Sequence, residues 1–154
     1  DERKVKFRKN IMLIKLLKKL PDERTIKKIN IEIKSPFAWD LRTARALSKI
    51  LKKLPIKRII ISSFNPFVIF YFKLFHRQFV TGFLFQNIEY LAFVNWIHPS
   101  YIHPRADLLN DDLISYAKSK NLGINVWTVN NEHAIDWCRG MQVDGIITDL
   151  GVIK

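Results

Sequence analysis

Residues 29–34, Ile-Asn-Ile-Glu-Ile-Lys, alternate strictly between apolar and polar side chains. This alternation predicts a β-strand, because successive side chains of a strand point to opposite faces of its sheet. The three isoleucines then share one face, and Asn30, Glu32 and Lys34 share the other. A face that carries both a carboxylate and an ammonium group suits the interior of a barrel near its mouth. It does not suit a sheet that helices cover on both sides.

Five further strands are expected along the chain, separated by helical patterns. The predicted strands are 58–64, 80–86, 100–103, 124–130 and 144–148. The predicted helices are 11–20, Asp40 to about Leu54, 67–75, 87–96, Asn110 or Asp111 to Gly123, and Asn131 to Gly140, with Gly123 as a left-handed cap. Strands that alternate with helices predict an α/β architecture with a parallel sheet. We therefore expect a single domain over residues 1–154, an incomplete TIM-type barrel of six parallel βα units, with the first two of eight missing.

Polar and aromatic side chains follow two of the predicted strands. The stretches are Asn-Val-Trp-Thr-Val-Asn at 125–130 and Asp-Gly-Ile-Ile-Thr-Asp at 144–149. Function in parallel sheets gathers at the carboxyl ends of the strands. A large aromatic ring beside hydrogen-bonding groups suits a ligand pocket there. The alternative is that Trp127 is a core aromatic and that Asp149 caps a helix.

The chain carries a formal net charge of +12, which is concentrated in its first 60 residues, where 19 Lys and Arg face 6 Asp and Glu. A basic segment attracts nucleic acid, anionic lipid or a phosphorylated substrate. The alternative is a set of lysines on solvated helix faces. No nucleic-acid-binding signature accompanies the charge, so we expect no nucleic-acid partner.

The cysteine content, the apolar runs and the N-terminus bear on where in the cell the protein is located. Cys138 is the only cysteine, which excludes an internal disulfide and a cysteine-rich metal site. No run of about 20 apolar residues predicts a membrane span. The N-terminus lacks both an initiator Met and the form of a signal peptide, so we expect the chain to be incomplete there. A cytoplasmic or membrane-peripheral location is compatible with these features.

Five motifs occur in order along nearly the whole chain. They are Ile-Glu-Ile-Lys at 31–34, Ile-Ser-Ser-Phe-Asn-Pro at 61–66, His103-Pro104 with Leu109 and Leu113, Val-Trp-Thr-Val-Asn at 126–130 and Asp-Gly-Ile-Ile-Thr-Asp at 144–149. Together they resemble the C-terminal portion of the glycerophosphodiester phosphodiesterase family, from its third to its eighth strand unit. The resemblance implies a TIM barrel. It also implies metal-dependent hydrolysis of glycerophosphodiesters to glycerol 3-phosphate and an alcohol.

The resemblance also implies roles for individual residues. Glu32 matches a ligand of the family's divalent cation, Mg²⁺ or Ca²⁺, and Lys34 matches a lysine beside the substrate phosphate. Trp127 matches a tryptophan of the substrate pocket, and His103 matches a family His-Pro more weakly. A simple ion pair between Glu32 and Lys34 is the alternative for that pair.

The family's catalytic histidines have no counterpart in this sequence. There is no His-Arg-Gly motif, and no Glu-x-Asp pair followed by a histidine precedes Glu32. No catalytic residue is therefore assigned, and we expect the isolated chain to be inactive or poorly active. The alternative function is a non-catalytic barrel remnant that binds anionic lipid or a protein partner. Contact with a membrane surface and self-association through open barrel edges are further expectations.

The histidines and phenylalanines have simpler interpretations. His76 and His133 are expected on helix surfaces, and structural roles are favoured for His98 and His103. Eight of the eleven phenylalanines lie between residues 64 and 85. Core packing is the default for this concentration, and a membrane-facing or substrate-access patch is the alternative.

Overall fold

The computed structural model describes residues 28–52 and 59–150, and the helix expected over 11–20 lies outside these ranges. Six parallel strands form one sheet in the order β1-β2-β3-β4-β5-β6. Their bounds are β1 Ile29–Glu32, β2 Ile59–Ser63, β3 Val80–Phe85, β4 Tyr101–Pro104, β5 Gly123–Val126 and β6 Gly145–Ile146. The expected strand order and direction are confirmed.

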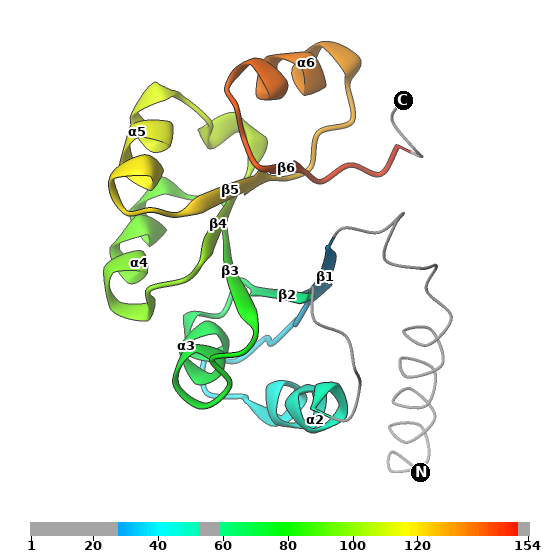
Figure 1. The fold of residues 1–154 in the computed structure, drawn as a ribbon, viewed down its shortest axis with the longest axis vertical. Coiled ribbons are helices and arrows are strands. Elements are labelled where there is room, and N and C mark those ends of the chain that lie inside the picture. Colours follow the sequence, from blue (N-terminus) through cyan, green and yellow to red (C-terminus); the bar gives the residue numbers. More distant parts are fainter. Residues whose placement is uncertain (1–27, 53–58, 151–154) are drawn as a thin grey trace.

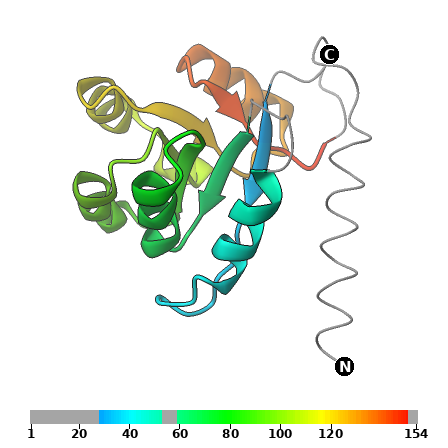
Figure 2. The same ribbon diagram turned by 60° about the horizontal axis from the view of Figure 1, so that its bottom comes forward.

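Helices connect the strands and lie on one side of the sheet, which curls into a half-barrel (Figure 1). They are α2 Arg42–Leu51, α3 Pro66–Phe75, α4 Leu91–Ile97, α5 Asp111–Ser119 and α6 Glu132–Gly140, with short 3₁₀ turns η1 Ile88–Tyr90 and η2 Ala106–Leu108. A second view shows the same arrangement, with the strands side by side and the helices outside them (Figure 2). The incomplete TIM-type barrel predicted from the sequence is therefore confirmed.

The hydrophobic core fills the space between the outer face of the sheet and the helices. Near β1 and β2, the buried isoleucines Ile33, Ile59 and Ile61 pack with residues of α2 and α3. A second cluster joins β3, β4 and β5 to α4, α5 and α6. The opposite face of β1 carries Asn30, which is exposed, as the alternation of that strand predicts.

β5 and β6 fall furthest short of the strands that their sequence patterns predict. β5 ends at Val126 instead of residue 130, and beyond it Trp127 forms only an isolated bridge with Arg105. β6 contains two residues. Past the ends of these strands, backbone hydrogen bonds continue from Ile147 N to Val126 O and from Val129 N to Ile147 O, at 2.8 and 2.9 Å. The two segments thus stay together without a regular ladder.

The cap expected at Gly123 is wrong. α5 ends at Ser119, and the left-handed residue after it is Asn121, with φ of 53°. Gly123 instead begins β5, where a Cβ would overlap the ring of Tyr101. Its lack of a side chain is therefore needed for packing inside the barrel.

The other helix starts largely follow their capping residues. Asp40, the predicted cap of α2, lies one residue before the N-cap position, Leu41, and its carboxylate accepts a hydrogen bond from Arg42 N at 3.0 Å. Asn110 and Asn131 cap α5 and α6 through their side-chain oxygens. The expected extension of α2 to Leu54 falls partly outside the described residues.

His76 was expected on a helix surface, and this is wrong. It follows the last residue of α3 and is only 6% exposed. Its ring packs beside Tyr71 and Phe72, and its Nε2 lies 3.0 Å from the Tyr71 hydroxyl. The chain turns inward where α3 ends, which a helical pattern does not reveal. His133 lies exposed on α6, as expected.

Within residues 28–52 and 59–150, none of the helices has both the length and the apolar character needed to cross a bilayer.

Candidate functional site at the barrel mouth

The register of the sheet determines which side chains face the barrel interior. Paired residues of parallel strands share a face, so Glu32, Ser62, Gly82, Tyr101 and Gly123 form one row across the sheet. Alternation along each strand adds further inward positions, which are Asn30, Ile60, Leu84, His103, Asn125 and Gly145. The interior is therefore more polar than the outer face.

His103 lies at the centre of this interior wall. It is fully buried, and its ring occupies the space that the missing side chain of Gly82 leaves free. The Asn125 amide nitrogen lies 3.0 Å from His103 Nε2, so this ring nitrogen accepts the hydrogen bond and Nδ1 carries the proton. Burial lowers the pKa of His103 to about 4. The imidazole is consequently neutral at neutral pH, and Nδ1 has no partner among the described residues.

Trp127 follows β5 at the mouth of the half-barrel. Its indole Nε1 donates a 2.7 Å hydrogen bond to the backbone oxygen of His103. The ring of Phe64 meets it edge-on, with the ring centroids 5.2 Å apart. These contacts hold the indole, which is partly buried, in one orientation. Trp127 therefore lies where β5 ends, as the sequence pattern predicts.

Arg105 lies beside Trp127 and is committed to an acidic neighbour. Its guanidinium binds both carboxylate oxygens of Asp107, each at 2.6 Å. These hydrogen bonds raise the pKa of Arg105 and lower the pKa of Asp107. Both side chains are about half exposed, so the pair shapes the rim of the mouth and adds little to stability.

Glu32 ends β1 on the inner face, and Lys34 follows two residues later. Both side chains are exposed. Across the part of the chain that the structure describes, no ion pair joins them. They lie at the same end of the parallel sheet as Trp127, because all six strands run in one direction.

The strand exits at 125–130 and 144–149 come together as expected. The Asn130 side chain accepts hydrogen bonds from the Thr148 hydroxyl and from Asp149 N, at 3.0 and 2.9 Å. Its amide donates to the Asp149 carboxylate at 2.9 Å. This exposed network ties the segment after β6 to the segment after β5.

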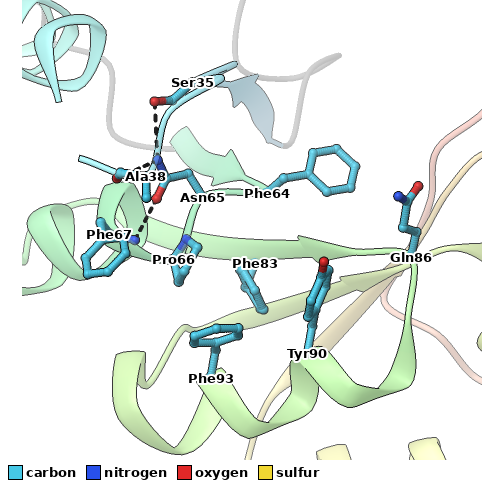
Figure 3. A pocket seen from close by; sticks show the side chains of 10 residues that line it. All are labelled: Ser35, Ala38, Phe64, Asn65, Pro66, Phe67, Phe83, Gln86, Tyr90 and Phe93. Atoms are coloured by element: carbon cyan, nitrogen blue, oxygen red, sulfur yellow. Dashed lines mark hydrogen bonds between the residues drawn. The ribbon is translucent and has the colours of Figure 1, made fainter. Parts of the chain in front are cut away.

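An aromatic cleft of about 620 Å³ lies at the carboxyl ends of β1, β2 and β3 (Figure 3). Its aromatic members are Phe64, Phe67, Phe83, Tyr90 and Phe93. The concentration of phenylalanines is visible in the sequence, but the cleft is not, because Tyr90 and Phe93 contribute to it from η1 and α4. Neither this cleft nor a smaller one near Arg77 is lined by Glu32, Lys34 or Trp127. That those three residues share one cavity stays a prediction.

The described residues do not make a complete site for a divalent cation. No group of three or more His, Cys, Asp or Glu side chains suited to a metal ion occurs in residues 28–52 and 59–150. Hard cations take six or more oxygen ligands, or keep several waters beside a few carboxylates. Glu32 supplies one carboxylate at the mouth, which fits one position of such a ligand set.

Comparison with known proteins gives a consistent result. The sequence model of the Glycerophosphoryl diester phosphodiesterase family matches residues 5–150. No curated protein matches the chain significantly. A glycerophosphodiester phosphodiesterase from Parabacteroides distasonis is 20% identical, with a TM-score of 0.70 over 80% of this chain and 53% of its own.

Two further solved structures show the same likeness. An Oleispira antarctica phosphodiesterase in complex with the product sn-glycerol-3-phosphate is 18% identical, with a TM-score of 0.70 over 79% of this chain and 51% of its own. A glycerophosphodiester phosphodiesterase from Thermotoga maritima is 26% identical, with a TM-score of 0.59 over 79% of this chain and 54% of its own. The chain thus spans about half the length of these proteins.

Proposed function

The chain belongs to the glycerophosphoryl diester phosphodiesterase family, and from this we propose that it forms the C-terminal portion, from the third to the eighth strand unit, of a barrel that hydrolyses glycerophosphodiesters to glycerol 3-phosphate and an alcohol. The observation that carries the proposal is the parallel half-barrel, whose mouth receives Glu32 and Lys34 from the end of β1 and Trp127 from the end of β5. The sn-glycerol-3-phosphate held by the Oleispira antarctica phosphodiesterase supports the assigned product.

Each of the three residues has a chemical role in this proposal. The Glu32 carboxylate would hold one position on a divalent cation, either Mg²⁺ or Ca²⁺, and other residues would complete its ligand set. Such a cation supplies Lewis-acid polarisation of a phosphoryl oxygen. The Lys34 ammonium group, two residues further along, would offset negative charge on the phosphate. The indole of Trp127 would form a wall against the bound substrate.

The histidines of the described residues are poorly placed to move a proton at the mouth. His103 is buried, engaged with Asn125 and neutral, since burial lowers its pKa to about 4. His133 lies exposed on α6, away from the inner face. General acid–base catalysis is worth about 10²–10⁴-fold. We therefore propose that the 154-residue chain alone hydrolyses glycerophosphodiesters poorly or not at all.

A complementation assay tests the proposal. The purified chain is assayed against glycerophosphocholine with excess Mg²⁺ or Ca²⁺, alone and after fusion to an N-terminal segment that carries His-Arg-Gly and a Glu-x-Asp pair. We expect turnover to rise by at least about 10²-fold on fusion. Glu32→Gln should abolish this gain, and Glu132→Gln on the exposed start of α6 should leave it unchanged.

Three results would count against the proposal. Robust turnover by the chain alone would show that other residues carry out the chemistry. If Glu32→Gln left the turnover of the fused protein unchanged, the Glu32 carboxylate would not be a ligand of the cation. A fused protein without turnover that still binds anionic vesicles would favour the alternative of a non-catalytic barrel.

A further inference from the structure

A polar cavity lies at the end of the half-barrel opposite the mouth. It opens where β3 and β4 begin, since its lining includes Val80, the first residue of β3, and Ser100, which precedes β4. The mouth lies at the carboxyl ends of the same strands, and the six residues of β3 span about 20 Å. The cavity is therefore separate from the site proposed for hydrolysis.

Two cations and two uncharged polar groups line this cavity. Lys73 comes from the last turn of α3, Arg77 and Gln78 from the turn that follows it, and Ser100 from the residue before β4. In the part of the chain that the structure describes, no acidic side chain lines the cavity, and neither cation forms an ion pair. None of the four side chains is hydrogen-bonded to another described residue. Their donors are thus available to a ligand.

The end of α3 accounts for only one of these cations. The carboxyl end of a helix carries about half a negative charge, so Lys73 in the last turn is favourable there without any ligand. Arg77 lies beyond the helix and brings a second positive charge to the same cavity. Together the two cations exceed the charge of the helix end by about one and a half elementary charges. The cavity therefore attracts an anion in spite of the helix end.

The backbone around the cavity is held in place from two sides. Phe79 N donates a 3.0 Å hydrogen bond to His76 O and closes the turn that carries the second cation. The Phe79 side chain is buried against Phe72, with the ring centroids 6.0 Å apart. On the other side, Ser100 N donates to Thr81 O at 3.0 Å. The walls are therefore present without a ligand, and mainly the two cationic side chains have to become ordered when an anion binds.

The lining matches a phosphate monoester better than a carboxylate. A phosphate monoester carries a charge of about −1.5 to −2 at neutral pH and three strong acceptor oxygens. This charge matches that of Lys73 and Arg77 together, and a guanidinium group can bind two of the oxygens at once. The Gln78 amide and the Ser100 hydroxyl supply further donors. The volume of about 350 Å³ leaves room for a small organic group beyond the phosphate.

We propose that this cavity binds the phosphate group of a phosphate monoester, at a site separate from the barrel mouth. Lys73 and Arg77 supply the charge, and Gln78 and Ser100 supply neutral hydrogen bonds. A small free molecule and a lipid headgroup can both present such a phosphate, and glycerol 3-phosphate, the product in the proposed function, is one example. The proposal does not depend on that function, because it concerns binding at the other end of the strands.

Titration of the full chain with sn-glycerol 3-phosphate tests the proposal without requiring turnover. Calorimetry measures the affinity, and amide chemical shifts in nuclear magnetic resonance spectra locate the bound ligand. We expect the shifts at the amides of Val80, Thr81 and Ser100, around the cavity. Glycerol, which lacks the phosphate, should cause none of them. Glycerophosphocholine, whose phosphodiester carries one negative charge, should require a higher concentration to cause the same shifts.

Lys73→Gln and Arg77→Gln should each weaken the binding of glycerol 3-phosphate about twofold to fivefold, the range expected for exposed charge pairs. The double variant should weaken it about tenfold while circular dichroism stays unchanged. The matched control is Lys118→Gln combined with Lys120→Gln, which removes the same charge from the exposed end of α5. At physiological salt this control should change the affinity less than about twofold, because distant surface charges are screened.

Vesicles test the second source of the same chemical group. Phosphatidate presents a phosphate monoester at a bilayer surface, and phosphatidylglycerol presents a phosphodiester. At equal surface charge, a lipid-headgroup site prefers phosphatidate, and the double variant Lys73→Gln/Arg77→Gln should lose this preference. Such a preference without binding of glycerol 3-phosphate would assign the cavity to lipid headgroups. Binding of glycerol 3-phosphate without the preference would assign it to free phosphate monoesters.

Three outcomes would overturn the inference. Affinities for both sources that the double variant leaves unchanged would show that the two cations do not form the site. Shifts confined to the indole N–H of Trp127 and abolished by Lys34→Gln would place the phosphate at the mouth. A parent chain that binds neither source at millimolar concentrations would leave the two cations as ordinary residues of a helix end. None of these outcomes bears on hydrolysis by the fused protein, so the proposed function is tested separately.

Discussion

At the scale of single residues, the barrel interior depends on pairs in which a glycine accommodates a larger neighbour. A Cβ at Gly82 would overlap the His103 ring, one at Gly123 the Tyr101 ring, and one at Gly145 the Asn125 side chain. None of these glycines has a positive φ. Their role is therefore steric, and it fixes where the interior polar side chains lie.

Gly82→Ala should destabilise the protein by about 1–3 kcal/mol, the usual cost of overpacking. The His103 ring cannot move aside easily, because it is fully buried and hydrogen-bonded to Asn125. Urea unfolding measures the change. Gly140→Ala is the control, since a Cβ there meets nothing within 4 Å, and it should be neutral or slightly stabilising. Equal effects of the two substitutions would contradict the steric role of Gly82.

His103 should make the free energy of unfolding depend on pH. Burial lowers the pKa of His103 from 6.5 to about 4 in the folded protein. Between these values the unfolded chain binds the proton and the folded chain does not, so stability is complete above pH 6.5 and falls as the pH drops toward 4. The loss amounts to at most about 3 kcal/mol.

Urea unfolding at a series of pH values measures this slope. His76 contributes in the same direction, because burial and the charge of Lys52 lower its pKa as well. His103→Gln should therefore remove most of the slope, and His76→Gln a smaller part. A slope that His103→Gln leaves unchanged would show that this imidazole does not titrate as proposed.

At the scale of elements, one side chain joins the start of α3 to the loop that leaves β1. The Asn65 oxygen caps α3 by accepting from Phe67 N at 2.9 Å, and the Asn65 amide makes three hydrogen bonds to residues 35–38. Asn131 only caps its helix, α6. A comparison of the two asparagines therefore distinguishes the contribution of helix capping from that of the hydrogen bonds to the loop.

Asn65→Ala should cost more stability than Asn131→Ala. Loss of a cap alone is worth about 1 kcal/mol. Asn65→Ala should exceed about 2 kcal/mol, because it also leaves two backbone oxygens without this donor in a site that is only 6% exposed. Thermal or urea unfolding of both variants measures the difference. Similar losses would mean that the amide bonds to residues 35–38 contribute nothing.

The elements could be predicted from the sequence better than their ends could. The alternation in 29–34 and the apolar runs of the later strands predicted all six strands and their order. The early end of β5 could not be foreseen, because Val126 and Trp127 both have side chains that are common in strands. In the structure Val126 is the last residue of β5, and Trp127 forms only an isolated bridge with Arg105. Gly123 was assigned to a helix end because it follows a helical pattern. The sequence does not show that it packs against Tyr101, which lies on another strand.

The parts of the candidate site that could be predicted are those whose residues lie close together in the sequence. Glu32 and Lys34 are two residues apart, so their shared face follows from strand alternation alone. The cleft combines side chains from three connections, such as Ala38, Phe64 and Phe93, and no local pattern links them. His76 was placed at the surface for the same reason, since its burial depends on contacts at the end of α3.

At the scale of the whole molecule, the parallel order leaves β1 and β6 at the two ends of the sheet. Within residues 28–52 and 59–150, each of these strands pairs with one neighbour only. Unpaired strand edges are templates for pairing with another chain. We therefore expect the isolated chain to self-associate through these edges.

The backbone of β1 allows a specific test of this expectation. Ile33 N donates to Ser62 O on β2 at 2.7 Å, so the alternate residues Asn30 and Glu32 direct their N–H groups to the open edge. Asn30→Pro removes one of these donors and leaves the ladder with β2 intact. Sedimentation velocity over a range of concentrations should show oligomers of the parent chain that Asn30→Pro reduces. Asn30→Ala, which keeps the N–H group, should behave like the parent. A parent chain that stays monomeric at all concentrations, or a proline variant that associates equally, would show that the β1 edge is not the contact.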